Sequence, residues 1–121
     1  MSNLEQLIKE NILVIDGAMG TQIQGLDMPQ SACEGNEGCN ELLNTTYSDA
    51  IREIHSAYLK AGADIIKTNT FGAMPWVLDE YHIGARTYEL AYAGAKLVKE
   101  AIAALATTKP RFIAGALGPG T

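Results

Sequence analysis

Residues 63–72 read ADIIKTNTFG, and they change from apolar to polar within one short segment. The apolar half, around Ile65 and Ile66, is typical of a buried strand. A strand that only completed a core would more often end at a Gly or Pro turn. The polar residues that follow it therefore predict a ligand-binding edge at the carboxyl end of the strand, with Thr68, Asn69 and Thr70 as candidate binding residues.

Two further apolar segments end in polar or glycine-rich turns. Residues 12–15 (ILVI) run into DGAMGT, and residues 112–117 (FIAGAL) run into GPGT. We predict a strand at each, the first buried on both faces. Helical periodicity lies between the strands, at 46–62 and at about 85–106, and Gly62 is placed to end the first helix. This alternation predicts an α/β protein with a parallel sheet built from right-handed βαβ units.

Residues 17–46 lack a long periodic pattern and are rich in glycine. We predict a long loop with at most one helical turn, of the kind that is usually functional or disordered. Cys33 and Cys39 both lie in it, and two thiols are too few for a secreted disulfide framework or a four-ligand zinc site. We expect both to be free thiols.

Composition limits the class of protein. The chain has 121 residues, 47% hydrophobic and 19% charged, which fits one globular unit over residues 1–121. A net charge of -5 and scattered basic residues argue against nucleic acid or an anionic membrane as partner. No apolar run approaches the ~20 residues of a membrane span, and the amino terminus does not resemble a signal peptide. We therefore expect a cytoplasmic protein.

The turn after the first predicted strand could bind an amino acid. Asp16 stands beside the backbone N–H groups of Gly17 and Ala18, which small side chains leave accessible. A carboxylate can hold an ammonium group while exposed N–H groups hold a carboxylate. The alternative is that Asp16 only caps a turn that glycine permits. In a parallel sheet this turn and the other two strand tips lie at one edge.

Other functions remain open from the residues alone. Gly17, Gly20 and Gly25 do not have the GxGxxG spacing, so the signal for a dinucleotide is weak. A nucleotide-binding doubly wound domain is still one alternative. A second is a non-catalytic βα module for binding or assembly.

Four segments together resemble the homocysteine S-methyltransferase family, and within it the homocysteine-binding domain of the cobalamin-dependent methionine synthases. They are ILVIDGAMGTQIQ (12–24), GCNELLN (38–44), IREIHSAYLKAGADIIKTNTFGA (51–73) and FIAGALGPGT (112–121). The segments follow the family's order and spacing over nearly the whole chain. One departure is Lys67, which stands where the cobalamin-dependent enzymes usually have an acidic residue.

The resemblance implies a parallel (βα)8 TIM barrel. This chain would be its amino-terminal part, with roughly the first three strands and two helical connections, cut from a longer sequence. Homocysteine would sit at the carboxyl ends of the strands, with Asp16 facing its amino group and the amides of Gly17 and Ala18 near its carboxylate. Thr68, Asn69 and Thr70 would belong to the same substrate site.

The activity implied by the resemblance is methyl transfer to zinc-activated homocysteine, giving methionine. The full-length protein would use zinc and methylcobalamin, and its cobalamin and methyltetrahydrofolate domains would be partners of this one. The family's zinc is held by three cysteines placed late in the barrel, which Cys33 and Cys39 do not match. We therefore expect no catalytic residue, metal or cofactor site in residues 1–121 alone, and no activity from them.

Overall fold

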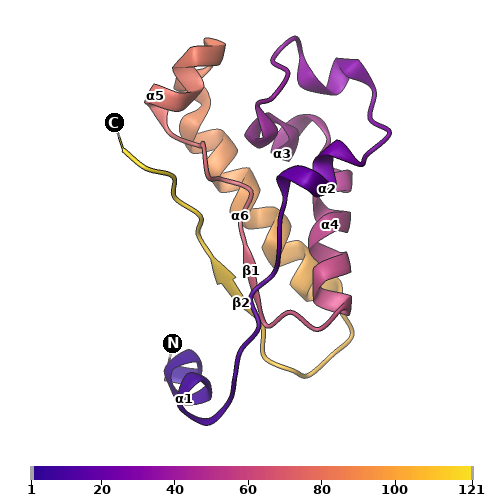
Figure 1. The fold of residues 1–121 in the computed structure, drawn as a ribbon, viewed down its shortest axis with the longest axis vertical. Coiled ribbons are helices and arrows are strands. Elements are labelled where there is room, and N and C mark those ends of the chain that lie inside the picture. The colour runs from indigo at the N-terminus through magenta and orange to yellow at the C-terminus, as the bar shows by residue number, and fades with distance from the viewer. Residues whose placement is uncertain (1, 121) are drawn as a thin grey trace.

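The computed structural model describes residues 2–120, with Ser2 described by its backbone only. Helices alternate with short parallel strands along the chain (Figure 1). The elements are α1 (Ser2–Glu10), α2 (Gly20–Gln24), η1 (Gln30–Cys33), η2 (Asn40–Leu42), α3 (Leu43–Thr46), α4 (Ser48–Lys60), β1 (Ile65–Lys67), α5 (Pro75–Leu78), η3 (Asp79–Tyr81), η4 (Gly84–Arg86), α6 (Thr87–Ala104) and β2 (Phe112–Ala114).

Three extended segments lie side by side in parallel. β1 pairs with β2 in the register Ile65↔Phe112, and Ile15 forms a parallel bridge to Ile65 on the other side of β1. The Asp16 N–H donates to the carbonyl oxygen of Ile65 at 2.9 Å. The prediction of a parallel sheet from βαβ units is therefore confirmed.

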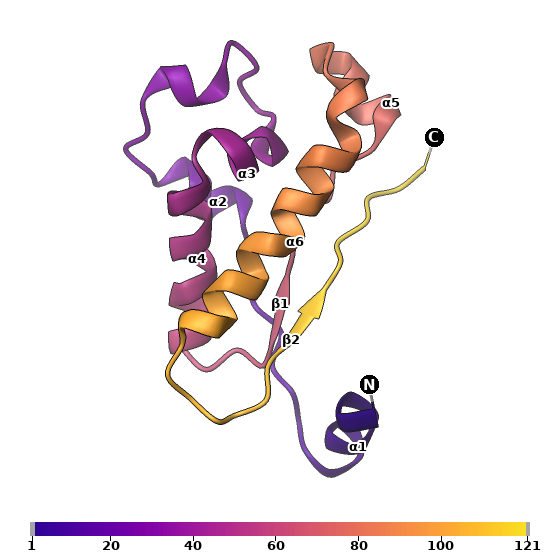
Figure 2. The same ribbon diagram turned by 180° about the vertical axis from the view of Figure 1, so that it is seen from behind.

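Helices α4 and α6 pack together and cover one face of the strands, as the two opposite views show (Figures 1 and 2). Leu59 of α4, Ile66 of β1 and Val98 of α6 are buried in one apolar cluster between these elements. Each such side chain contributes about 1.5–3 kcal/mol by leaving water. None of the helices within residues 2–120 is both long and apolar enough to cross a lipid bilayer.

The first predicted strand differs from the expectation. Residues 12–15 are extended, but the side chains of Ile12 and Val14 are 93% and 55% exposed, so burial on both faces is wrong. The cause is that α4 and α6 form a layer on one face only, and β1 is the one strand that pairs with this segment within residues 2–120. The third strand is also shorter than predicted and ends at Ala114.

Gly62 ends helix α4 as predicted. Its φ is +109°, a left-handed conformation that glycine adopts without a Cβ penalty. The N–H of Gly62 donates to the Leu59 carbonyl at 3.0 Å, and the N–H of Ala63 donates to the Tyr58 carbonyl at 3.1 Å. These two bonds form a Schellman motif, which turns the chain directly into β1.

Residues 17–46 contain more helix than the sequence pattern predicts. Elements α2, η1, η2 and α3 all fall there, so a loop with a single helical turn is wrong. Their apolar residues Ile23, Ala32 and Leu43 are buried against Ile51 of α4. Helices this short are stabilised by packing rather than by their own propensity, and a periodicity window cannot detect them.

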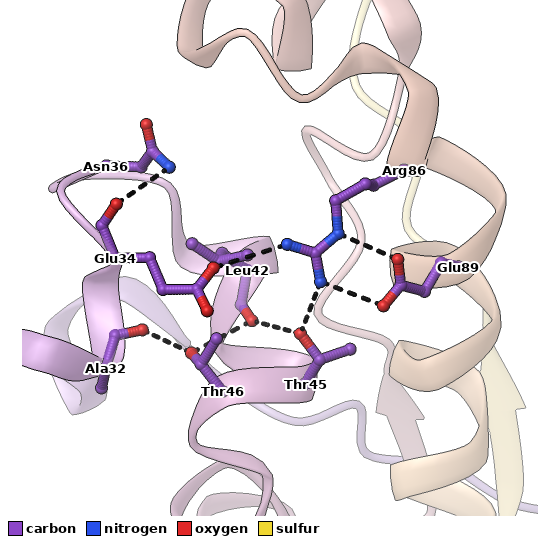
Figure 3. A network of polar contacts seen from close by, with 8 residues as sticks. All are labelled: Ala32, Glu34, Asn36, Leu42, Thr45, Thr46, Arg86 and Glu89. Atoms are coloured by element: carbon purple, nitrogen blue, oxygen red, sulfur yellow. Dashed lines mark hydrogen bonds and ion pairs between the residues drawn. The ribbon is translucent and has the colours of Figure 1, made fainter.

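Arg86 connects this segment to the start of α6 (Figure 3). Its guanidinium donates to both carboxylate oxygens of Glu89, at 2.9 and 3.0 Å, and to Thr45 Oγ1 at 3.3 Å. It also forms an ion pair with Glu34 at 3.5 Å. The network fixes α3 and the preceding segment against α6, beside the carboxyl edge of the strands.

Candidate functional site

Asp16 and Lys67 form the centre of the carboxyl edge. The Asp16 side chain is only 3% exposed, and its two oxygens are both engaged by Lys67: Oδ1 pairs with the ammonium, and Oδ2 accepts from the Lys67 backbone N–H at 3.2 Å. The same ammonium donates to the carbonyl oxygens of Asp16 at 3.1 Å and Gly17 at 3.2 Å. The first and second strand tips are therefore joined by an internal ion pair.

The turn at Gly17 and Ala18 is held from helix α4. The Tyr58 hydroxyl donates to the Ala18 carbonyl at 2.6 Å, and a Cβ on Gly17 would lie 3.0 Å from that hydroxyl oxygen. Both turn residues are exposed. Their N–H groups donate no hydrogen bond to any residue within 2–120. Two adjacent donors that follow Asp16 in the chain are thus without an acceptor in that range, as an anion-binding turn requires.

Thr68 and Thr70 are buried and hydrogen-bonded to the segment that follows β2. Their hydroxyl oxygens are 2.6 Å apart, Thr70 donates to the Ala116 carbonyl at 2.8 Å, and the Ala116 N–H donates to Thr68 Oγ1 at 3.0 Å. The threonine side chains thereby extend the pairing of the second and third strands beyond Ala114. Their hydroxyl groups shape the carboxyl edge through contacts within the chain.

Asn69 is bound to Asn44 in the GCNELLN segment. Its side-chain amide donates to Asn44 Oδ1 and to the Asn40 backbone carbonyl, both at 2.9 Å, and the backbone carbonyl of Asn69 accepts from Asn44 Nδ2 at 2.8 Å. The second Asn44 N–H donates to the Leu90 carbonyl of α6 at 3.1 Å. All donors of both buried amides are satisfied, so this pair fixes the second strand tip against α3 and α6.

Two glycines allow the elements around this edge to approach closely. A Cβ on Gly94 of α6 would lie 2.5 Å from Thr70 Cγ2, and one on Gly118 would lie 2.5 Å from the Phe71 carbonyl oxygen. The Gly118 N–H donates to that same carbonyl at 2.9 Å. The third strand tip therefore contacts the second, and all three tips lie at one edge of the sheet (Figure 1).

His55 of α4 is a buried polar residue. Its side chain is fully buried, and neither ring nitrogen has a hydrogen-bond partner within residues 2–120. Burial lowers its pKa from 6.5 to about 4, while the Asp16 charge raises the pKa and the Lys67 charge lowers it. The imidazole is therefore neutral at neutral pH. Its position between Ile51 and Leu59 on one helix face was the only sequence signal of burial.

Comparison with known proteins supplies the family. A sequence model of the homocysteine S-methyltransferase family matches residues 13–121. The chain belongs to the homocysteine S-methyltransferase family. It is 38% identical to the methionine synthase of Mycobacterium tuberculosis and 37% identical to that of Mycobacterium leprae, over 99% of its own length. The chain spans 10% of the length of each of these relatives.

Solved structures of a homocysteine methyltransferase show the same fold. The crystal structures of MmuM from Escherichia coli, in metallated and oxidized forms, superpose with TM-scores of 0.73 and 0.74 at 23% and 25% sequence identity. The superposition covers 96% of this chain and 41% or 40% of MmuM. The chain thus has the fold of part of a (βα)8 barrel, as its resemblance to the homocysteine S-methyltransferase family implied.

The side chains within residues 2–120 do not form a metal-binding site. No three His, Cys, Asp or Glu side chains in that range lie close enough together to hold an ion. Cys33 is half-buried and Cys39 is buried, and both are free thiols, as predicted. Burial, together with the Glu41 charge, raises the pKa of Cys39, so its thiol stays protonated at neutral pH.

Proposed function

We propose that the whole protein carrying this chain transfers a methyl group to homocysteine to give methionine. In this proposal, residues 16–18 hold the amino-acid end of homocysteine. One observation carries the assignment: the exposed residues Gly17 and Ala18 directly follow the buried Asp16, and their N–H groups have no acceptor within residues 2–120. Membership of the homocysteine S-methyltransferase family supports the choice of substrate.

The roles of the turn residues follow from their charges. The N–H groups of Gly17 and Ala18 would donate to the substrate carboxylate, and the Asp16 carboxylate would accept from the substrate ammonium. We further propose that Thr68, Asn69 and Thr70 line the same site. Their hydrogen bonds to Ala116 and Asn44 hold the second strand tip in a fixed position, which favours a preorganised site.

The thiol of homocysteine must lose its proton to attack a methyl group, because a free thiol has a pKa of ~8.5. The resemblance implies zinc for this step and methylcobalamin as the methyl donor. Residues 2–120 do not present a ligand set for zinc, so we propose that both are bound by other parts of the whole protein. The cobalamin and methyltetrahydrofolate domains of that protein would then be the partners of this chain.

Replacing Asp16 by Asn in the whole protein tests the assignment. Lys67 pairs with the same carboxylate, so the exchange is made in a Lys67→Met background. There it removes the charge that would hold the substrate ammonium, and homocysteine binding should weaken by about 1–3 kcal/mol. Asp27→Asn makes the same chemical change at an exposed position and should leave binding unchanged. Equal affinity of Lys67→Met with and without Asp16→Asn, with the fold intact by circular dichroism, would refute the role of Asp16.

A further inference from the structure

The oxygen atoms around the Lys67 ammonium already form an ammonium site. They are Asp16 Oδ1, the Asp16 carbonyl oxygen at 3.1 Å and the Gly17 carbonyl oxygen at 3.2 Å. A lysine ammonium has three N–H donors, so these contacts use its full donor capacity. The α-ammonium of an amino acid has the same charge and the same number of donors. The two groups are therefore chemically equivalent ligands for one set of oxygens.

We infer that the Lys67 ammonium is an internal occupant of the substrate's ammonium site, and that Lys67 thereby determines how strongly the protein selects for an α-amino group. The inference rests on the proposed function, because it takes Asp16 as the partner of the substrate ammonium. It adds that Lys67 competes with the substrate ammonium for Asp16, which the proposed role of Asp16 does not include.

The competition follows from the contacts. A substrate ammonium that enters must displace Lys67, so one set of charge-assisted hydrogen bonds replaces another and the amino group adds little net affinity. The Lys67 side chain is 40% exposed, so its ammonium can move into water when displaced. The N–H groups of Gly17 and Ala18 do not contact Lys67 and remain available to a carboxylate.

Two ligands and one substitution test the inference in the full-length natural protein. Homocysteine and 4-mercaptobutyrate share the thiol, the carboxylate and the chain length, and differ only in the amino group. Lys67→Met removes the competing ammonium and keeps an unbranched side chain of similar length. Lys60→Met at an exposed position of α4 is the matched control. Isothermal titration calorimetry gives the Kd of each ligand for each protein.

In the wild type, the two ligands should bind within about threefold of each other, because the amino group exchanges for Lys67. Lys67→Met should tighten homocysteine about tenfold, or about 1.4 kcal/mol, and leave 4-mercaptobutyrate within about twofold. Lys60→Met should match the wild type. The wild-type comparison needs no variant, so it tests the inference even if Lys67→Met does not fold.

Four outcomes would overturn the inference. A wild-type preference for homocysteine of more than about a hundredfold would show that Lys67 does not compete. Weaker binding of both ligands to Lys67→Met would make Lys67 a partner of the carboxylate instead. Unchanged homocysteine affinity in Lys67→Met would remove its role while leaving the proposed function intact. If neither ligand binds any of the proteins, the proposed function fails, and this inference fails with it.

Discussion

His55 should make the protein less stable as the pH falls from 6.5 towards 4. In the folded state its pKa is about 4, because burial disfavours the imidazolium, whereas an unfolded chain titrates near 6.5. Above 6.5 both states are neutral and His55 adds no pH dependence. Below 6.5 the unfolded chain binds a proton that the folded chain does not, so acid favours unfolding.

The size of this effect follows from the shift. One pKa unit is worth about 1.4 kcal/mol, so the loss of unfolding free energy should reach about 3 kcal/mol near pH 4. Asp16 and Lys67 act on the imidazole with opposite sign, so burial remains the main cause. Because neither ring nitrogen is hydrogen-bonded within residues 2–120, an apolar ring can replace the imidazole without leaving a partner unsatisfied there.

Urea unfolding of wild type and His55→Phe, followed by circular dichroism, measures the effect in the domain that carries this chain. The stability of His55→Phe relative to wild type should rise by about 3 kcal/mol between neutral pH and pH 4. His55→Leu provides a smaller side chain in case phenylalanine is too large. His82→Asn controls for the loss of an exposed imidazole, at a positive φ that asparagine tolerates. A relative stability that stays constant with pH within about 0.5 kcal/mol would refute the reasoning.

Two further substitutions test contacts that hold the sheet. Gly94→Ala should lower the free energy of unfolding by about 1–3 kcal/mol, because the added Cβ would lie 2.5 Å from Thr70 Cγ2, and this overpacking outweighs the gain in helix propensity. A rise in Tm on thermal unfolding would contradict it, and Ala95→Ser on the exposed face of the same helix is its control. Asp64→Asn should cost about 1–3 kcal/mol at neutral pH, because the carboxylate accepts from the Val14 N–H at 2.8 Å and pairs with Lys109 at 2.7 Å. These contacts hold the pKa of Asp64 below its usual range. The stability that Asp64 contributes should therefore be present at neutral pH and be lost as the pH falls through the folded-state pKa. An Asp64→Asn variant as stable as wild type at neutral pH would contradict this.

The long periodic segments were predictable because their signals are local. Spacing within one segment predicts the apolar face of α4, its end at Gly62 and the apolar residues of β1. The alternation of strands with helices made a parallel sheet the expected arrangement. The short helices between residues 17 and 46 were not predictable in the same way. Their stability comes from contacts of Ile23 and Leu43 with residues far along the chain.

The sequence by itself determined the parallel βα order, the family resemblance and the candidate residues at the strand tips. Only the tertiary structure decided which contacts those residues make within residues 2–120. Asn69 is hydrogen-bonded to Asn44, Gly94 leaves room for the Thr70 side chain, and Lys67 forms an ion pair with Asp16. Partners 24 to 51 positions apart leave no periodic trace along the chain. Whether a polar side chain faces a ligand or another residue is set by three-dimensional proximity, which depends on all the packed elements together.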